Sequence, residues 1–163
     1  YHKRLNSKKL KIDENSILIV RGCGPVGYPG SAEVINMQPP DRLLKKGINA
    51  LPTLGDGRQS GTSESPSILH VSPESAVGGD LAIVKTGDKM TIDLNKRRVD
   101  LQITKSEFIK RRKNKKIKKL TNQTPWQEIS RSNVGQLEDG ACIISRDQYL
   151  DITKTKGILR NSH

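Results

Sequence analysis

The sequence predicts an α/β fold in which short strands form a mixed, barrel-like sheet and short helices lie on its outside. Apolar runs of four or five residues recur along the chain, separated by loops rich in glycine, proline and serine. Helix signals are short, so the helices are expected to cover the sheet. With 163 residues, the chain is long enough for one domain with its own core, although only 33% of it is hydrophobic.

The predicted strands share aliphatic and β-branched residues and are bounded by turn residues. The last two alternate in polarity and are joined by a turn at 95–98, as in a hairpin. The expected strands are residues 16–20, 50–54, 68–71, 81–84, 90–94 and 99–103.

The predicted helices are identified by their ends. Asp41 as N-cap and Gly47 bracket a short helix at 42–46. Thr104 has capping-box spacing to Glu107 at the start of a basic helix. A helical turn at 32–37, stopped by two prolines, and a weak helix at 149–153 are also expected.

The domain is expected to occupy residues 16–163. Residues 1–15 are polar and basic and are interpreted as a linker from an upstream, N-terminal domain. No run of 18 apolar residues occurs, which indicates a protein without a membrane span. Cys23 and Cys142 are too few for a disulfide framework and lack metal-ligand spacing, so we expect reduced thiols and a cytoplasmic location.

The net charge of +12 is concentrated in two runs. Residues 110–119 carry eight basic residues and no acid, and residues 1–11 carry five more. The rest of the chain is nearly neutral. Such runs are typical of a solvated helix face and a linker, and aromatic residues that could stack on bases are scarce. We therefore expect no nucleic-acid partner.

Two glycine-rich loops contain the candidate site residues. The first includes the pattern Gly-Cys-Gly-Pro-Val-Gly at 22–27, but its prolines oppose the helix that a dinucleotide site needs. Ser60 lies in the second loop, without the glycine two residues before it that the motif of a hydrolase nucleophile requires. Locally, Ser60 can be a turn residue and Glu33 a surface acid near a helix start. Asp56 and Arg58 are interpreted as a loop-stabilising ion pair or as backbone caps, and His70 as a core or sheet histidine.

Three loops together resemble a known family: RGCGPVGYPGSAE at 21–33, GDGRQSGTS at 55–63 and VSPESAVGG at 71–79. They are similar to the C-terminal domain of the dihydroxy-acid and sugar-acid dehydratases, and closest to the pentonate and hexonate branch. These enzymes remove water from a dihydroxy acid with an iron–sulfur cluster and a divalent metal. The resemblance implies a swivelling β/β/α domain that works with an N-terminal domain of the same protein, in a homo-oligomer.

The resemblance also implies roles for individual residues. Glu33 matches a carboxylate ligand of Mg²⁺, and Ser60 matches the base that removes the proton from C2 of the substrate. Thr62 matches a threonine near the departing C3 hydroxyl, while Gly30 and the terminal His163 match positions that could reach the substrate. The cluster would be held by the N-terminal domain. The chain departs from the family pattern at Ser31, where methionine is usual.

The resemblance implies conversion of an aldonic acid to its 2-keto-3-deoxy acid, with the isolated chain inactive. Two alternatives stay open. The substrate could instead be the branched-chain dihydroxy acid of valine and isoleucine synthesis. The chain could also be a non-catalytic binding module derived from this domain, with its basic helix facing an acidic partner.

Overall fold

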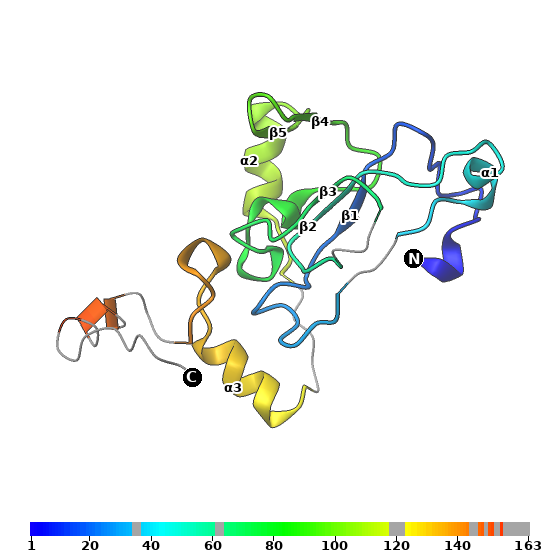
Figure 1. Ribbon diagram of the computed structural model, residues 1–163. Coiled ribbons are helices and arrows are strands. Elements are labelled where there is room, and N and C mark those ends of the chain that lie inside the picture. Colours follow the sequence, from blue (N-terminus) through cyan, green and yellow to red (C-terminus); the bar gives the residue numbers. More distant parts are fainter. Residues whose placement is uncertain are drawn as a thin grey trace.

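The structure is a computed structural model of the 163-residue chain (Figure 1). It describes residues 1–33, 37–60, 64–117 and 123–143, together with positions 147, 148, 150, 151 and 154. The described strands form a parallel sheet and a separate hairpin, and short helices surround them. No helix in these ranges is both long and apolar enough to cross a membrane.

The three-stranded parallel sheet contains β1 (Leu18–Val20), β2 (Thr53–Gly55) and β3 (Ser67–Ile68), in that order. Leu18 is aligned with Thr53, and Thr53 with Ser67. Because parallel strands point the same way, the loops after all three strands leave from one edge of the sheet. The predicted strands at 16–20 and 50–54 are confirmed with shifted or shorter bounds, whereas the strand predicted at 68–71 is found at 67–68 and overlaps the prediction only at Ile68.

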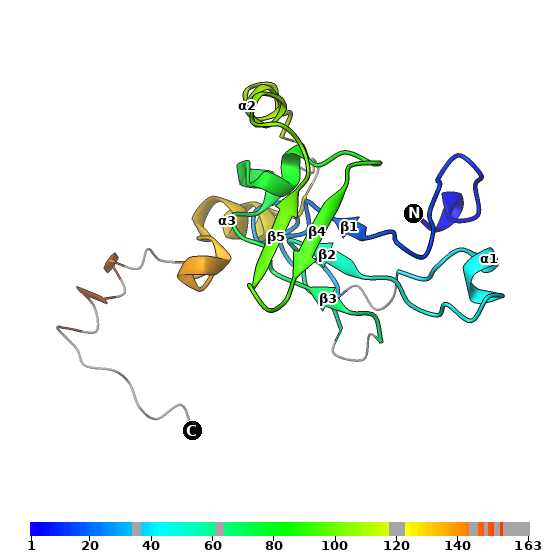
Figure 2. The same cartoon turned by 90° about the horizontal axis from the view of Figure 1, so that it is seen from above.

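The hairpin contains β4 (Met90–Asp93) and β5 (Arg98–Leu101), which pair antiparallel and align Met90 with Leu101. Figure 2 shows the hairpin lying over the parallel sheet. The predicted hairpin is confirmed. The strands that the structure describes do not close a barrel, so the α/β class is confirmed while the barrel-like arrangement stays a prediction.

Two aliphatic clusters hold these elements together. One contains Leu18, Leu43 and Leu51, each at most 6% exposed, and the other contains Leu54, Leu81 and Val84. Full burial of a leucine contributes about 1.5–3 kcal/mol. Since Leu18 and Leu54 belong to neighbouring strands, the clusters fix the strands whose ends carry the loops.

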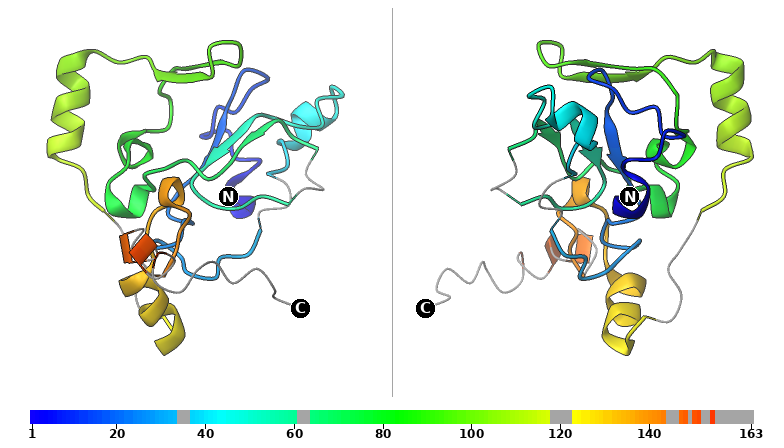
Figure 3. Two further views of the ribbon diagram at one scale, coloured as in Figure 1. Left: turned by 60° about the vertical axis from the view of Figure 1, so that its left-hand side comes forward. Right: turned by 90° about the vertical axis from the view of Figure 1, so that its right-hand side faces the viewer.

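Figure 3 shows α1 and α2 at opposite ends of the domain, with α3 on the side away from the hairpin. The helices are short and several are 3₁₀ turns. They are η1 (His2–Arg4), α1 (Asp41–Leu44), η2 (Ser75–Val77), η3 (Asp80–Ile83), α2 (Lys105–Lys113), α3 (Pro125–Asn133) and η4 (Leu137–Asp139).

One strand prediction and one helix-cap prediction need correction. Residues 81–84 were expected to form a strand, but they belong largely to η3, whose Ala82 N–H donates to the Gly79 carbonyl. A short buried apolar run cannot be assigned to strand or helix by periodicity alone. Asp41 is the first residue of α1 rather than its cap, because Pro40 occupies the cap position.

The remaining helix predictions are mixed. Thr104 caps α2 by accepting from the Glu107 N–H, as expected. Helix α3 was not predicted, although Thr124 and Gln127 form a full capping box and Pro125 begins the helix. Residues 34–36 of the expected turn at 32–37 lie outside the described residues. The same is true of residues 149, 152 and 153 of the expected helix at 149–153.

The basic run is less solvated than expected. Arg111 binds Asp88 and Glu107 with a side chain only 12% exposed. Lys115 Nζ donates to the Gly78 carbonyl at 2.7 Å. Residues 1–15 also contact the domain, since Leu5 is buried and Ile12 packs on the first cluster. The proposed boundary between residues 15 and 16 stays a prediction.

Candidate functional site

The candidate site is formed by the loops that follow β1, β2 and β3. In open parallel sheets, ligands bind beyond the carboxyl ends of the strands. Residues 21–33 follow β1, residues 56–60 follow β2, and residues 69–79 follow β3. These are the three loops whose sequences resemble the dehydratases, and the parallel sheet brings them to one edge.

Asp56 joins all three loops. Its side chain is fully buried and accepts hydrogen bonds from the backbone N–H groups of Gly22 and Cys23, both at 3.0 Å. It also accepts from Ser75, whose N–H lies at 2.9 Å and whose hydroxyl lies at 2.5 Å from Oδ2. The expectation that Asp56 caps backbone groups is confirmed. Among the described residues it forms no ion pair with Arg58.

Glu74 supports the second half of the first loop in the same way. This side chain is also fully buried, and its oxygens accept from the N–H groups of Val26 and Gly27 at 2.8 Å. Gln136 donates to it at 3.0 Å. A Cβ atom on Gly24 would lie 2.5 Å from Glu74 Oε2, so glycine permits the close approach. The two carboxylates together hold both halves of the loop.

This arrangement explains the glycine pattern at 22–27. Four N–H groups of the loop already bind internal carboxylates, and no helix begins there. A phosphate-binding loop needs such N–H groups to face its ligand. The dinucleotide interpretation is therefore wrong for this loop, as its prolines suggested.

Helix α3 also holds the first loop, which the sequence did not indicate. Gln127 Nε2 donates to the Pro29 carbonyl, and Arg131 Nε donates to the Val26 carbonyl, both at 2.9 Å. These side chains are four residues apart and lie on one face of the helix. The contacts secure the segment immediately before Gly30 and Glu33.

One hydrogen bond joins the two loops that carry the candidate residues. Arg58, two residues before Ser60, donates from Nη2 to the Ser31 carbonyl at 3.4 Å, two residues before Glu33. Ser60 is partly buried, whereas Glu33 and Gly30 are exposed. Gly30 adopts φ of +71°, which favours glycine. Thr62 and His163 lie outside the described residues.

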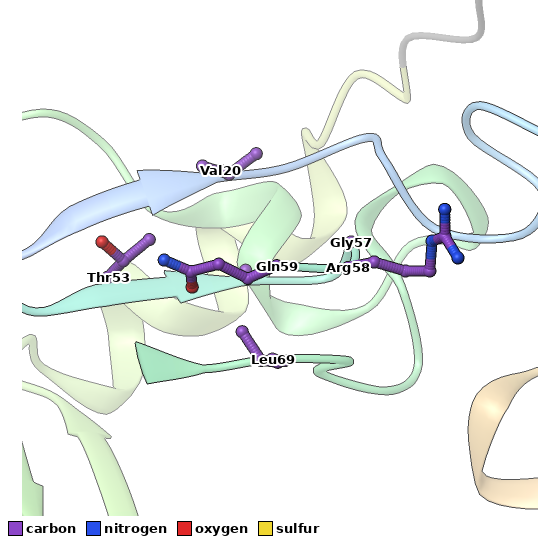
Figure 4. Close-up of a pocket in the computed structure, with 7 residues that line it drawn as sticks. Val20, Thr53, Gly57, Arg58, Gln59 and Leu69 are labelled. Carbon is purple, nitrogen blue, oxygen red and sulfur yellow. The ribbon is translucent and has the colours of Figure 1, made fainter. Parts of the chain in front are cut away.

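A small pocket lies beside the paired ends of β1 and β2 (Figure 4). Val20, Thr53 and Leu69 line it, and the side chain of Gln59 extends back along β2 toward Thr53. Arg58 points away from the pocket. The guanidinium therefore lies on the exposed side of the second loop, toward the first.

The described residues supply few metal ligands. They contain no group of three or more His, Cys, Asp or Glu side chains suited to a metal ion. Glu33 has no hydrogen bond or ion pair to any other described residue, so its carboxylate can accept an external cation. One carboxylate suits Mg²⁺, which keeps several waters and binds few protein ligands. The chain thus fits one ligand of a magnesium site.

The cysteines do not fit an iron–sulfur cluster. Cys23 is partly buried between the loops, Cys142 is exposed, and neither belongs to a ligand group among the described residues. Burial and the nearby Asp56 carboxylate raise the pKa of the Cys23 thiol, which opposes the thiolate that a cluster needs. Cluster ligands would have to come from elsewhere.

His70 was misjudged from the sequence. It was expected to be a core or sheet histidine, yet it is exposed and follows the end of β3 with φ of +54°. The strand ends at Ile68, earlier than the apolar run implied. His70 therefore belongs to the third loop.

The chain is similar to known dehydratases along most of its length. A family model described as the C-terminal part of dihydroxy-acid/6-phosphogluconate dehydratases matches residues 1–141. A D-xylonate dehydratase of Caulobacter vibrioides is 53% identical over 152 residues, covering 93% of this chain and 26% of that protein. An L-arabinonate dehydratase of Rhizobium leguminosarum bv. trifolii is 48% identical over 111 residues, covering 68% of this chain and 19% of that protein. A dihydroxy-acid dehydratase of Thermodesulfovibrio yellowstonii is 40% identical over 134 residues, covering 82% and 24%. The chain thus spans about a quarter of the length of these relatives or less.

Proposed function

Because the chain belongs to the dihydroxy-acid/6-phosphogluconate dehydratase family, as its C-terminal domain, we propose that it is part of a sugar-acid dehydratase. The complete enzyme would remove water from an aldonic acid and release the 2-keto-3-deoxy acid. One observation carries the proposal: Asp56 and Arg58 tie the loop of Ser60 to the loop of Glu33 at one edge of the parallel sheet.

The relatives support the substrate class. The relatives at 53% and 48% identity are named for D-xylonate and L-arabinonate, which are pentonic acids. The dihydroxy-acid dehydratase is less similar and supports a second candidate, a branched-chain dihydroxy acid. Both substrates carry a carboxylate with hydroxyls on C2 and C3, so the same site chemistry serves either.

Ser60 would act as the base. In its deprotonated form, Oγ would take the proton from C2, and the C2–H electron pair would form the C2–C3 double bond as the C3 hydroxyl leaves with its bonding electrons. The proton taken up by Ser60 and the departing hydroxide together account for the water that is released. The product is an enol, which tautomerises to the keto acid. Thr62 would lie beside the departing hydroxyl and orient it.

Glu33 would hold the metal. A bound Mg²⁺ would neutralise the substrate carboxylate and the charge that develops next to it. The exposed position of Glu33 leaves room for ligands from the substrate and from another domain. Gly30 and His163 are the further candidates for substrate contact.

The iron–sulfur cluster would be held by another domain of the enzyme. This chain has no fitting ligand set among its described residues, so we assign the cluster to an N-terminal domain of the same protein. A swivelling β/β/α domain in a homo-oligomer would bring the two domains together.

The test is an assay of the complete enzyme and of the isolated chain. Each is incubated with D-xylonate, L-arabinonate or 2,3-dihydroxyisovalerate in the presence of Mg²⁺, and formation of the keto acid is measured. We expect the complete enzyme to act on a pentonate and the isolated chain to act on none. Exclusive turnover of dihydroxyisovalerate would favour the second substrate. Absence of any turnover by a cluster-loaded complete enzyme would favour a non-catalytic module.

A further inference from the structure

The proposed mechanism gives no chemical role to the buried carboxylate of Asp56. Asp56 is fully buried, four residues before Ser60 in the sequence, and it binds both neighbouring loops. Burying a carboxylate is costly unless its oxygens are hydrogen-bonded. Four hydrogen bonds to its oxygens offset this cost. Two come from Gly22 and Cys23 in the first loop, and two come from Ser75 in the third loop.

We infer that Asp56 is a positioning residue that sets the Ser60 loop in register with the loop that carries Glu33. The inference rests on the proposed function, because it concerns the alignment of the base with the metal ligand. Asp56 lies at the end of the central strand, so a shift of its carboxylate moves both flanking loops relative to the loop of Ser60.

The hydrogen-bond pattern requires a carboxylate at this position. Oδ2 accepts from Gly22 and from both donors of Ser75, while Oδ1 accepts from Cys23. An asparagine amide has one accepting oxygen and one donating nitrogen. Whichever way it is turned, Asp56→Asn places an N–H group against at least one backbone N–H. The loops must then separate, although the volume of the side chain is unchanged.

A small separation has a large effect on catalysis. A displacement of about 1 Å at the reacting groups can reduce the rate by roughly a hundredfold. Glu33 lies beyond the segment that Asp56 holds, so its placement as a metal ligand should suffer together with the alignment of Ser60. A residue that merely stabilises the fold would change neither property once the protein is folded.

The experiment compares three variants of the complete enzyme below their unfolding temperatures. Asp56→Asn changes the acceptor, and Ser75→Ala removes only the hydroxyl that donates at 2.5 Å. Leu43→Ala is the control, because Leu43 is buried in the first cluster and lies outside the three loops. The measurements are kcat, the affinity for Mn²⁺ as a probe of the magnesium site, and amide hydrogen exchange at residues 21–33.

We expect Asp56→Asn to lower kcat by about tenfold or more, to weaken Mn²⁺ binding and to speed exchange at Gly22 and Cys23. Ser75→Ala should change all three in the same direction by less, and it decides the matter if Asp56→Asn does not fold. Leu43→Ala should lower the unfolding temperature alone.

Folded loop variants with unchanged kcat and Mn²⁺ affinity would overturn the inference, provided that the unaltered enzyme dehydrates its substrate. An unaltered enzyme that dehydrates neither a sugar acid nor a dihydroxy acid would overturn the proposed function, and the inference with it.

Discussion

The Arg111 guanidinium binds the Asp88 carboxylate through two hydrogen bonds, from Nη1 at 2.6 Å and from Nη2 at 3.0 Å. The two side chains are 12% and 10% exposed, so the pair is largely shielded from water. Arg111 Nε also donates to Glu107 at 2.7 Å, within the same helix. This network attaches α2 to the segment before β4.

Replacement of Arg111 by methionine should lower the midpoint of thermal unfolding by several degrees. The change leaves the Asp88 carboxylate shielded from water and without its main partner, which is the costly way to break such a pair. Thermal unfolding followed by circular dichroism measures the effect. Arg98→Met is the matched control, because Arg98 pairs with Asp100 at an exposed position, where ion pairs contribute little. An equal loss in both variants would contradict this account.

The same network predicts a pH dependence. Hydrogen bonding to Arg111 lowers the pKa of Asp88 and of Glu107 below their ordinary values of about 4. Their contribution to stability is therefore fully present above that pH and is lost as the pH falls through the lowered pKa values. We expect the stability difference between the unaltered protein and Arg111→Met to shrink as the pH is lowered from 7 to about 3. A difference that stays constant over this range would refute the assignment.

Gly79→Ala should be strongly destabilising. A Cβ atom at this position would overlap the Pro73 carbonyl oxygen, and backbone atoms cannot move aside as a flexible side chain can. Overpacking of this kind costs about 1–3 kcal/mol or more. Gly135→Ala is the control, since its nearest contact would be an ordinary 3.6 Å from Cys142. Urea denaturation of both variants measures the difference, and similar midpoints would show that the third loop tolerates the added atom.

The two cysteines should differ in reactivity. Burial, together with the Asp56 carboxylate, raises the pKa of Cys23, whereas Cys142 is exposed. The thiolate is the reactive form, so less of Cys23 is reactive at pH 8 and access to it is poorer. Alkylation by iodoacetamide, followed by peptide mass spectrometry, should modify Cys142 first. Faster modification of Cys23 would mean that the first loop opens readily.

Ser60 and Glu33 should respond differently to magnesium in the complete enzyme. Ser60→Ala removes the proposed base, and kcat should fall by at least roughly a hundredfold at any Mg²⁺ concentration. Glu33→Gln leaves the base intact and supplies a poorer ligand for a hard cation, so added Mg²⁺ should restore part of its rate. Rates measured against Mg²⁺ separate the two roles. Near-normal turnover by Ser60→Ala, or equal rescue of both variants, would reject this assignment.

Local features of the structure could be predicted from the sequence. The hairpin follows from alternating residues and a turn, predicted at 95–98 and found at 94–97, and the start of α2 follows from the Thr104 cap. Both depend on neighbours in the chain. The same holds for the apolar runs that form β1 and β2. The sequence interpretation failed at two places. The apolar run at η3 was ambiguous between strand and helix, and the capping signal at Thr124 before α3 was not used.

The sequence by itself determined the α/β class and, through its loop motifs, the family and the candidates Glu33 and Ser60. Only the tertiary structure decided how these loops are held together. Asp56 binds residues 34 positions before it and 19 after it, and α3 reaches Val26 and Pro29 from about a hundred residues away. Such contacts arise because parallel strands bring distant loops to one edge, where a buried carboxylate must find donors from whichever segments lie beside it.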